Sequence, residues 1–155
     1  FGGMPVFYGD PQRPEILHAA KVDQAEFFVI AMDDPEINIK TAELVRSLYP
    51  HMKIIARARN RQHVHRLVDL DASPVRETFY SSLEMSRRTL VGLGLTQAQA
   101  DARISRFKNH DLQLLAAQHA VYDDAAKVMQ SAQEARTELA RLFEMDRLEE
   151  ESDKV

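Results

Sequence analysis

Cysteine is absent from the 155 residues of this chain. Without a thiol there can be no disulfide framework, no thiolate metal site and no cysteine nucleophile, and a reducing compartment suits such a sequence. No apolar run approaches the roughly 18 residues that cross a bilayer. The start, Phe1-Gly2-Gly3, has no initiator methionine and none of the features of a signal peptide. We therefore expect a soluble, cytoplasmic piece of a longer protein.

An excess of positive charge is also missing. The 20 basic residues are outnumbered by 24 acidic ones, which gives a formal net charge of -4. Charges of both signs are mixed along the chain, so the sequence has no footprint for binding nucleic acid. The composition, 45% hydrophobic and 28% charged, predicts one globular core with room for an extra helical arm.

The first half of the chain alternates short apolar runs with helical patterns, which is typical of an α/β unit with a mostly parallel sheet. Apolar runs predict strands over 4–8, 27–31 and 53–58; because the second is apolar throughout, we expect it inside the sheet. Helices are predicted over 14–20, from the Asp34 cap and Pro35 to Leu48, and over 61–70. We interpret residues 71–74 as a turn.

From Glu77 onward the alternation ends and the pattern is helical. One helix carries Phe79 and Leu83 and closes at residues 92–95, and Thr96 is a plausible N-cap for a helix over 97–120. A last helix is predicted from 124 to about 150. The predicted domains are therefore an α/β part, residues 1–76, and a helical arm, residues 77–155.

The carboxyl ends of parallel strands are where open α/β sheets bind ligands. Three segments occupy that edge here, namely residues 8–10, 31–35 and 57–60. Asp10 could accept a bond from an adenine amine or simply fix a turn, since Gly-Asp-Pro is ordinary turn chemistry. The chain has no Gly-x-Gly-x-x-Gly and no Walker loop. At most half of a dinucleotide site is expected.

Nothing in the sequence indicates catalysis or a metal site. His63 and His65 lie on opposite sides of a predicted helix, and no other histidine has a partner four residues away. The carboxylate pairs Asp33-Asp34 and Asp123-Asp124 are typical of helix caps. No Ser, His and Asp are arranged for nucleophilic chemistry, so we expect no catalytic residue and no enzyme.

Four segments, in this order, resemble one known family. They are Phe7-Tyr8-Gly9-Asp10, Ala31-Met32-Asp33-Asp34-Pro35-Glu36-x-Asn38, the run from Pro50 to Arg59, and Arg76-Glu77-Thr78-Phe79. The set looks like the C-terminal regulatory domain of the Kef glutathione-regulated potassium efflux proteins, of the KefB/KefC type. The resemblance covers nearly the whole chain and implies a partial Rossmann-like parallel sheet followed by a C-terminal helical arm.

The resemblance implies a sensor for an adenine nucleotide, NAD(H) or AMP, and for glutathione or its conjugates. It implies a homodimer at the cytoplasmic face of a bacterial inner membrane, with a potassium–proton antiporter domain on the same chain. An ancillary flavin-dependent quinone oxidoreductase is a further implied partner. Glutathione would keep the efflux system closed, and its conjugates would open that system.

Site residues follow from the matching motifs. The family's nucleotide contacts fall on two rims, namely Gly9, Asp10 and Pro11, and Ala31, Met32 and Asp33. The family's glutathione arginine matches Arg76, whose guanidinium could grip a carboxylate with two parallel bonds. From the residues alone, Arg76 would instead be a surface arginine paired with Glu77 or Asp71. A second glutathione contact falls on Asp111, which can only accept hydrogen bonds when ionised.

Other functions remain open at this point. A regulator of potassium uptake with the same fold would sense nucleotide only. A nicotinamide-dependent dehydrogenase could end in a similar tail, with its catalytic acid or base elsewhere. A dimerisation piece with no ligand is the third alternative.

Overall fold

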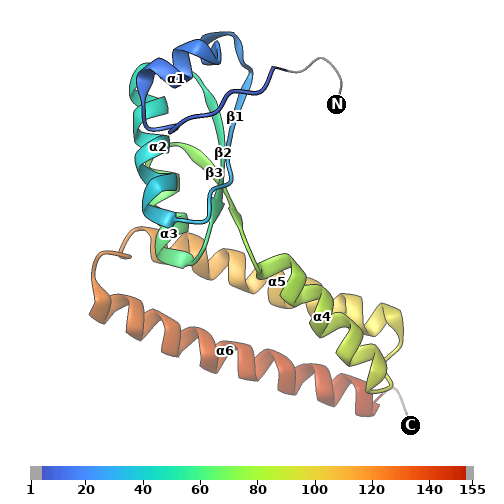
Figure 1. The fold of residues 1–155 in the computed structure, drawn as a ribbon. Helices are drawn as coiled ribbons and strands as arrows, with labels where there is room; N and C mark the ends of the chain where they lie inside the picture. The colour runs from blue at the N-terminus through green and yellow to red at the C-terminus, as the bar shows by residue number, and fades with distance from the viewer. Residues whose placement is uncertain (1–4, 153–155) are drawn as a thin grey trace. The chain divides into compact units, whose positions relative to one another are not determined.

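The computed structural model describes residues 5–152, apart from the side chains of residues 126 and 148–152. The chain divides into two compact units, residues 1–79 and 80–155. The first contains the sheet and the second is helical (Figure 1). A three-stranded Rossmann-like sheet followed by C-terminal helices confirms the predicted fold class.

The sheet of the first unit has three parallel strands in the order β1-β2-β3. They are β1 (Phe27–Ile30), β2 (Lys53–Ala58) and β3 (Ala72–Arg76). In register, Ile30 faces Ala56 across the first pair, and Ala58 faces Arg76 across the second. All three carboxyl ends therefore meet at one edge, as parallel pairing requires.

Helices α2 (Pro35–Leu48) and α3 (Arg61–Asp69) connect the strands and cover one face of the sheet (Figure 1). Helix α2 begins as predicted: the Asp34 side chain accepts from the backbone N–H groups of Glu36 and Ile37, and Pro35 takes the first turn. The core lies between helices and sheet, with buried members on all of these elements: Ile30, Ile39, Ala42, Val45, Ile54, Ala56, Ala58, Val64, Leu67 and Ala72. Helix α1 (Pro14–Ala19) and a short 3-10 turn (Val22–Gln24) precede β1.

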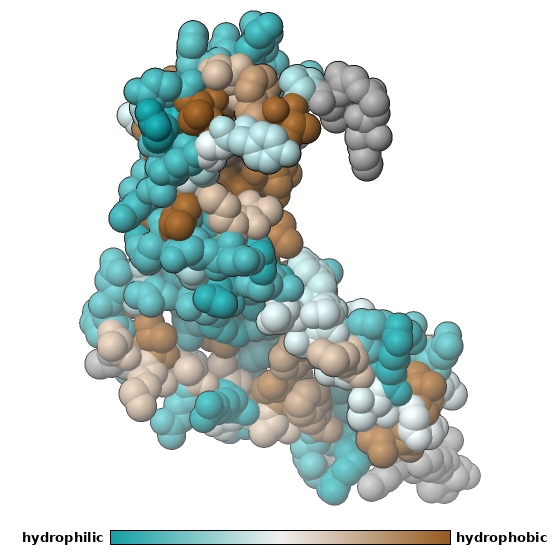
Figure 2. Space-filling model, viewed as in Figure 1, coloured by the Kyte–Doolittle hydropathy of each residue, from teal (hydrophilic) through white to brown (hydrophobic). Residues whose placement is uncertain are grey.

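The other face of the sheet is not covered by α2 or α3. Val29 and Val75 are 64% and 46% exposed there, and they alternate along their strands with more buried neighbours. Figure 2 shows apolar side chains at the surface of the first unit on this side.

Arg46 fastens the opposite, amino-terminal edge of the sheet. From helix α2 its guanidinium donates to the carbonyls of Leu70 (3.0 Å), Pro50 (2.6 Å), Met52 (2.9 Å) and Asp71 (2.7 Å). These carbonyls belong to the turns that lead into β2 and β3. One charged side chain thus donates hydrogen bonds to carbonyl oxygens of both turns.

Three predictions for the first unit are wrong. Residues 5–8 form no strand, because no neighbouring strand pairs with them, and Tyr8 is 91% exposed. Strand β1 forms an edge of the described sheet rather than its interior. Residues 72–76 form a strand and not a turn; Pro74 is accommodated because β3 is an edge strand, where a missing N–H is tolerated.

The second unit contains α4 (Phe79–Gly92, entered at the unit boundary), α5 (Gln97–His119) and α6 (Ala125–Ser152). Thr96 forms the expected N-cap: its hydroxyl accepts from the N–H of Gln99, whose side chain accepts from Thr96 N. The Arg106 side chain of α5 pairs with Asp146 of α6, a carboxylate only 4% exposed. Among residues 5–152, no helix is both long and apolar enough to cross a membrane.

Candidate functional site

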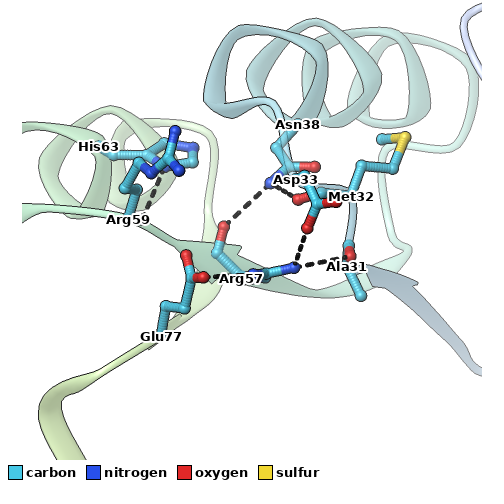
Figure 3. A network of polar contacts seen from close by, with 8 residues as sticks. All are labelled: Ala31, Met32, Asp33, Asn38, Arg57, Arg59, His63 and Glu77. Atoms are coloured by element: carbon cyan, nitrogen blue, oxygen red, sulfur yellow. Dashed lines mark hydrogen bonds and ion pairs between the residues drawn. The ribbon is translucent and has the colours of Figure 1, made fainter.

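The carboxyl edge of the sheet gathers polar side chains from the ends of all three strands (Figure 3). The predicted rim residues Ala31, Met32 and Asp33 follow β1 directly. Arg57 comes from the end of β2, and Glu77 follows β3. Residues far apart in the sequence therefore meet at the edge where α/β sheets bind ligands.

Arg57 lies at the centre of this group. One terminal nitrogen, Nη1, donates to the Asp33 carboxylate at 2.7 Å and to the Ala31 carbonyl at 3.4 Å. The other, Nη2, donates to the Glu77 carboxylate. The hydrogen bond from Arg57 holds the pKa of Glu77 below its ordinary value. The Glu77 carboxylate therefore remains charged at neutral pH beside the guanidinium.

Asn38 fixes the same edge from the helix side. Its amide nitrogen donates to the carbonyls of Met32, at 3.0 Å, and Arg57, at 3.2 Å, and the residue is only 2% exposed. Because these carbonyls belong to the ends of β1 and β2, one buried amide holds both strand ends together. The backbone of the predicted rim is thus fixed by helix α2.

The other predicted rim, Gly9 to Pro11, forms a tight loop before α1. A Cβ on Gly9 would lie 2.6 Å from Cδ1 of Ile16, so the glycine allows the loop to approach the helix closely. The Asp10 carboxylate accepts from the N–H of Gln12 at 2.9 Å, which is the turn role that the sequence left open. Pro11 is half-buried beside it.

Arg76 ends strand β3, in register with Ala58 of β2. Its guanidinium carbon lies 3.5 Å from the centre of the Phe79 ring, so the two side chains stack. Stacking uses the flat face of the guanidinium and orients its N–H edge, the part that binds carboxylates. Arg76 thus has a fixed direction at the carboxyl edge of the sheet.

Asp111 belongs to the second unit, on α5, and only 5% of it is exposed. A buried carboxylate of this kind is uncommon unless it has polar partners. Arg76 belongs to the first unit, so the structure describes each predicted glutathione residue within its own unit.

His63 lies in the first turn of helix α3, in an unusual environment for a titratable group. Its Nδ1 accepts from the N–H of Arg59 at 3.0 Å, and the side chain is buried. Burial, helped by the charge of Arg66 and opposed by Glu36, lowers the pKa of His63. The ring is therefore neutral at physiological pH and serves the fold. In the described part of the chain, no three acidic or histidine side chains gather as a metal site.

Sequence reasoning placed Arg57 at this edge and offered Glu77 only as a partner of Arg76. It did not predict the bridge from Asp33 through Arg57 to Glu77, nor the contacts of the Asn38 amide. One signal was present: Arg57 stands on a strand whose alternating face is otherwise apolar or exposed, and a charge there must find partners at a strand end. The identity of those partners depends on the register of three strands, which only the structure supplies.

Comparison with known proteins gives two family models, one for each half of the chain. Residues 2–76 match the TrkA-N domain, and residues 81–155 match the potassium efflux system KefB C-terminal domain. The second of these models describes part of a potassium efflux system.

Individual relatives agree with these models. Over 114 residues the chain is 42% identical to the glutathione-regulated potassium-efflux system protein KefC of Salmonella arizonae; the match covers 73% of the chain and 18% of that protein. The chain thus spans less than a fifth of the length of this curated relative.

Among solved structures, the Shewanella denitrificans Kef CTD in AMP bound form is 35% identical, with a TM-score of 0.71, covering 74% of this chain and 73% of that one. The GsuK RCK domain is 28% identical over 49% of this chain and 17% of the other, at a TM-score of 0.45. Because it covers 74% of the chain, the first of these structures matches residues in both units. The chain is a regulatory domain rather than an enzyme, and it belongs to the Kef family of potassium-efflux C-terminal domains.

Proposed function

We propose that this chain is the ligand-sensing part of a glutathione-gated potassium–proton antiporter. An adenine nucleotide, AMP or NAD(H), binds along the two rims, Gly9 to Pro11 and Ala31 to Asp33. The likeness to a Kef domain described in its AMP-bound form supports the nucleotide. The two rims would offer backbone groups and the exposed Asp33 carboxylate to such a ligand.

Glutathione binds through Arg76, with Asp111 as its second contact. The observation that carries this assignment is the stacking of Arg76 on Phe79 at the carboxyl end of β3. A guanidinium held in one direction loses little conformational freedom when it grips a carboxylate, and glutathione has two carboxylates. Asp111 would accept from the ligand's ammonium group or from Arg76.

Regulation follows from differential binding. Two copies of the chain associate below an antiporter domain of the same polypeptide, at the cytoplasmic face of a bacterial inner membrane. Glutathione stabilises the closed arrangement, and a bulkier conjugate stabilises the open one, because each binds the two states with different affinity. A flavin-dependent quinone oxidoreductase is the proposed ancillary partner. The match of residues 81–155 to an efflux family supports efflux over potassium uptake.

Calorimetric titration of glutathione into the full-length protein tests this function. Arg76→Ala should weaken binding roughly tenfold or more, as expected from losing a hydrogen bond to a charged group. Arg88→Ala is the matched control, because Arg88 is a 75% exposed arginine that pairs with Glu84 and has no assigned ligand. Unchanged glutathione affinity in Arg76→Ala would contradict the assignment, and AMP titrated separately tests the nucleotide rims.

A further inference from the structure

The Arg57 side chain bonds to groups that follow both β1 and β3. These outer strands do not pair with each other, since each pairs only with β2. The Arg57 side chain, 32% exposed, extends from the central strand to Asp33 on one side and Glu77 on the other (Figure 3). The strand ends are therefore joined through one guanidinium.

The bond toward β1 is the weaker of the two. Asp33 is 95% exposed, and ion pairs of such exposed groups contribute little because water competes for both partners. Asp33 also lies in the proposed nucleotide rim. A nucleotide that donates to this carboxylate, as an adenine amine would, removes one of the two acids that share Arg57.

The bond toward β3 is better protected. The Glu77 side chain is 29% exposed, and the N–H of Glu77 donates to the Ala58 carbonyl at 3.0 Å, which anchors the backbone beside β2. Glu77 follows Arg76 directly in the chain. While Arg57 holds the Glu77 carboxylate, this acid is not available to compete with an anionic ligand for Arg76.

We propose that Arg57 couples the two ligand sites, so that a nucleotide bound at Asp33 strengthens the binding of a carboxylate ligand at Arg76. This inference rests on the proposed function and adds a mechanism to it. When the nucleotide occupies Asp33, the guanidinium turns fully to Glu77 and withdraws that acid from Arg76. By thermodynamic linkage the carboxylate ligand must strengthen nucleotide binding by the same factor.

Calorimetry on the full-length protein tests the coupling, with glutathione titrated in the absence and presence of saturating AMP. In the unmodified protein, AMP should lower the glutathione Kd by roughly fivefold, at the lower end of typical allosteric factors. Arg57→Met should weaken glutathione binding and reduce the AMP effect to none, because Glu77 then competes for Arg76 in both conditions.

A second variant separates this mechanism from a general loss of structure. Glu77→Gln removes the competing charge, so glutathione should bind at least as tightly as in the unmodified protein while the AMP effect again disappears. Adding Glu77→Gln to Arg57→Met should restore the affinity that Arg57→Met lost. A variant that merely disturbed folding would not be rescued by a second substitution at the same edge.

Arg66→Gln is the matched control. Arg66 is a similarly exposed arginine that pairs with a carboxylate of the neighbouring helix, Glu36, and the AMP effect should persist in this variant. If the unmodified protein binds both ligands but AMP leaves the glutathione Kd unchanged, or if Arg57→Met keeps the full AMP effect, the coupling is refuted and the proposed function stands. If the unmodified protein binds neither ligand, the proposed function itself fails.

Discussion

The Arg76 guanidinium lies over the Phe79 ring, its central carbon 3.5 Å from the ring centre. The two residues straddle the junction at which strand β3 ends and helix α4 begins. The ring therefore sets the direction in which the arginine leaves the sheet. A ligand bound by Arg76 would therefore meet a guanidinium that its aromatic neighbour has already oriented.

Phe79→Leu should weaken glutathione binding by roughly twofold to fivefold, which corresponds to the ~0.5–1 kcal/mol of an exposed cation–π contact. The reason is that leucine leaves the guanidinium without a face to stack on, and its orientation is lost. Titration calorimetry gives the Kd. Phe79→Tyr keeps an aromatic face and should bind like the unmodified protein; equal weakening in both variants would show that stacking is not the cause.

Asn38→Ala should lower the free energy of unfolding by about 2 kcal/mol, because it leaves the part-buried carbonyls of Met32 and Arg57 without this donor. Urea unfolding followed by circular dichroism measures this loss. Lys40→Ala changes an exposed position of the same helix and should have little effect. A loss as small as in Lys40→Ala would mean that the amide does not hold the strand ends.

Stability should fall as the pH is lowered through the histidine range. Burial lowers the pKa of His63 in the folded state, whereas the unfolded chain titrates near the ordinary value of about 6.5. The contribution of His63 is therefore complete above pH ~6.5 and is lost as the pH falls toward the lower folded pKa. Protonation would also place a second N–H opposite the N–H of Arg59, which now donates to Nδ1.

Thermal unfolding between pH 5 and 8 separates this residue from the other histidines. His63→Asn should show a flatter pH dependence than the unmodified protein. His51→Asn, a change at an exposed histidine, should leave the slope as it was. An equal slope in the His63 variant would assign the pH dependence to other groups.

Glu84 of helix α4 should titrate far below ordinary glutamates. Bonds from Arg87 and then Arg88, three and four residues along the helix, lower its pKa to about 2. Carboxyl chemical shifts in an acid titration report this value. In a variant with both arginines changed to glutamine, the pKa should return to the usual range near 4.3. High salt should shift it in the same direction, since the carboxylate is 43% exposed.

Local chemistry decided which elements could be predicted from the sequence. The Asp34-Pro35 start of α2, strand β2 and the Thr96 cap depend on neighbouring residues alone, and the structure has each of them where the sequence placed it. Strand β3 was missed because Ser73-Pro74 is typical of a turn. Only pairing with β2 makes those residues extended, and pairing is not a local property.

The candidate site also has one part that the sequence could predict and one part that it could not. Arg76 and the rim around Asp33 were found through motifs that the family shares, and their roles remain proposals. The bridge from Asp33 through Arg57 to Glu77 could not be predicted, because it requires three strand ends to be placed within a guanidinium's reach. That placement depends on the order and register of the strands.

Parallel pairing in the first unit also dictates the order of events when the chain folds. Phe27 can pair with Lys53 only after the whole of α2 has been synthesised and packed. In the same way, Ile54 can pair with Ala72 only after α3. Closing such long loops makes parallel sheets slow to form, whereas the helices of the second unit form from local contacts within microseconds. Strand β1 is therefore synthesised before β2, its partner in the described sheet, and until the two strands pair its apolar side chains favour aggregation.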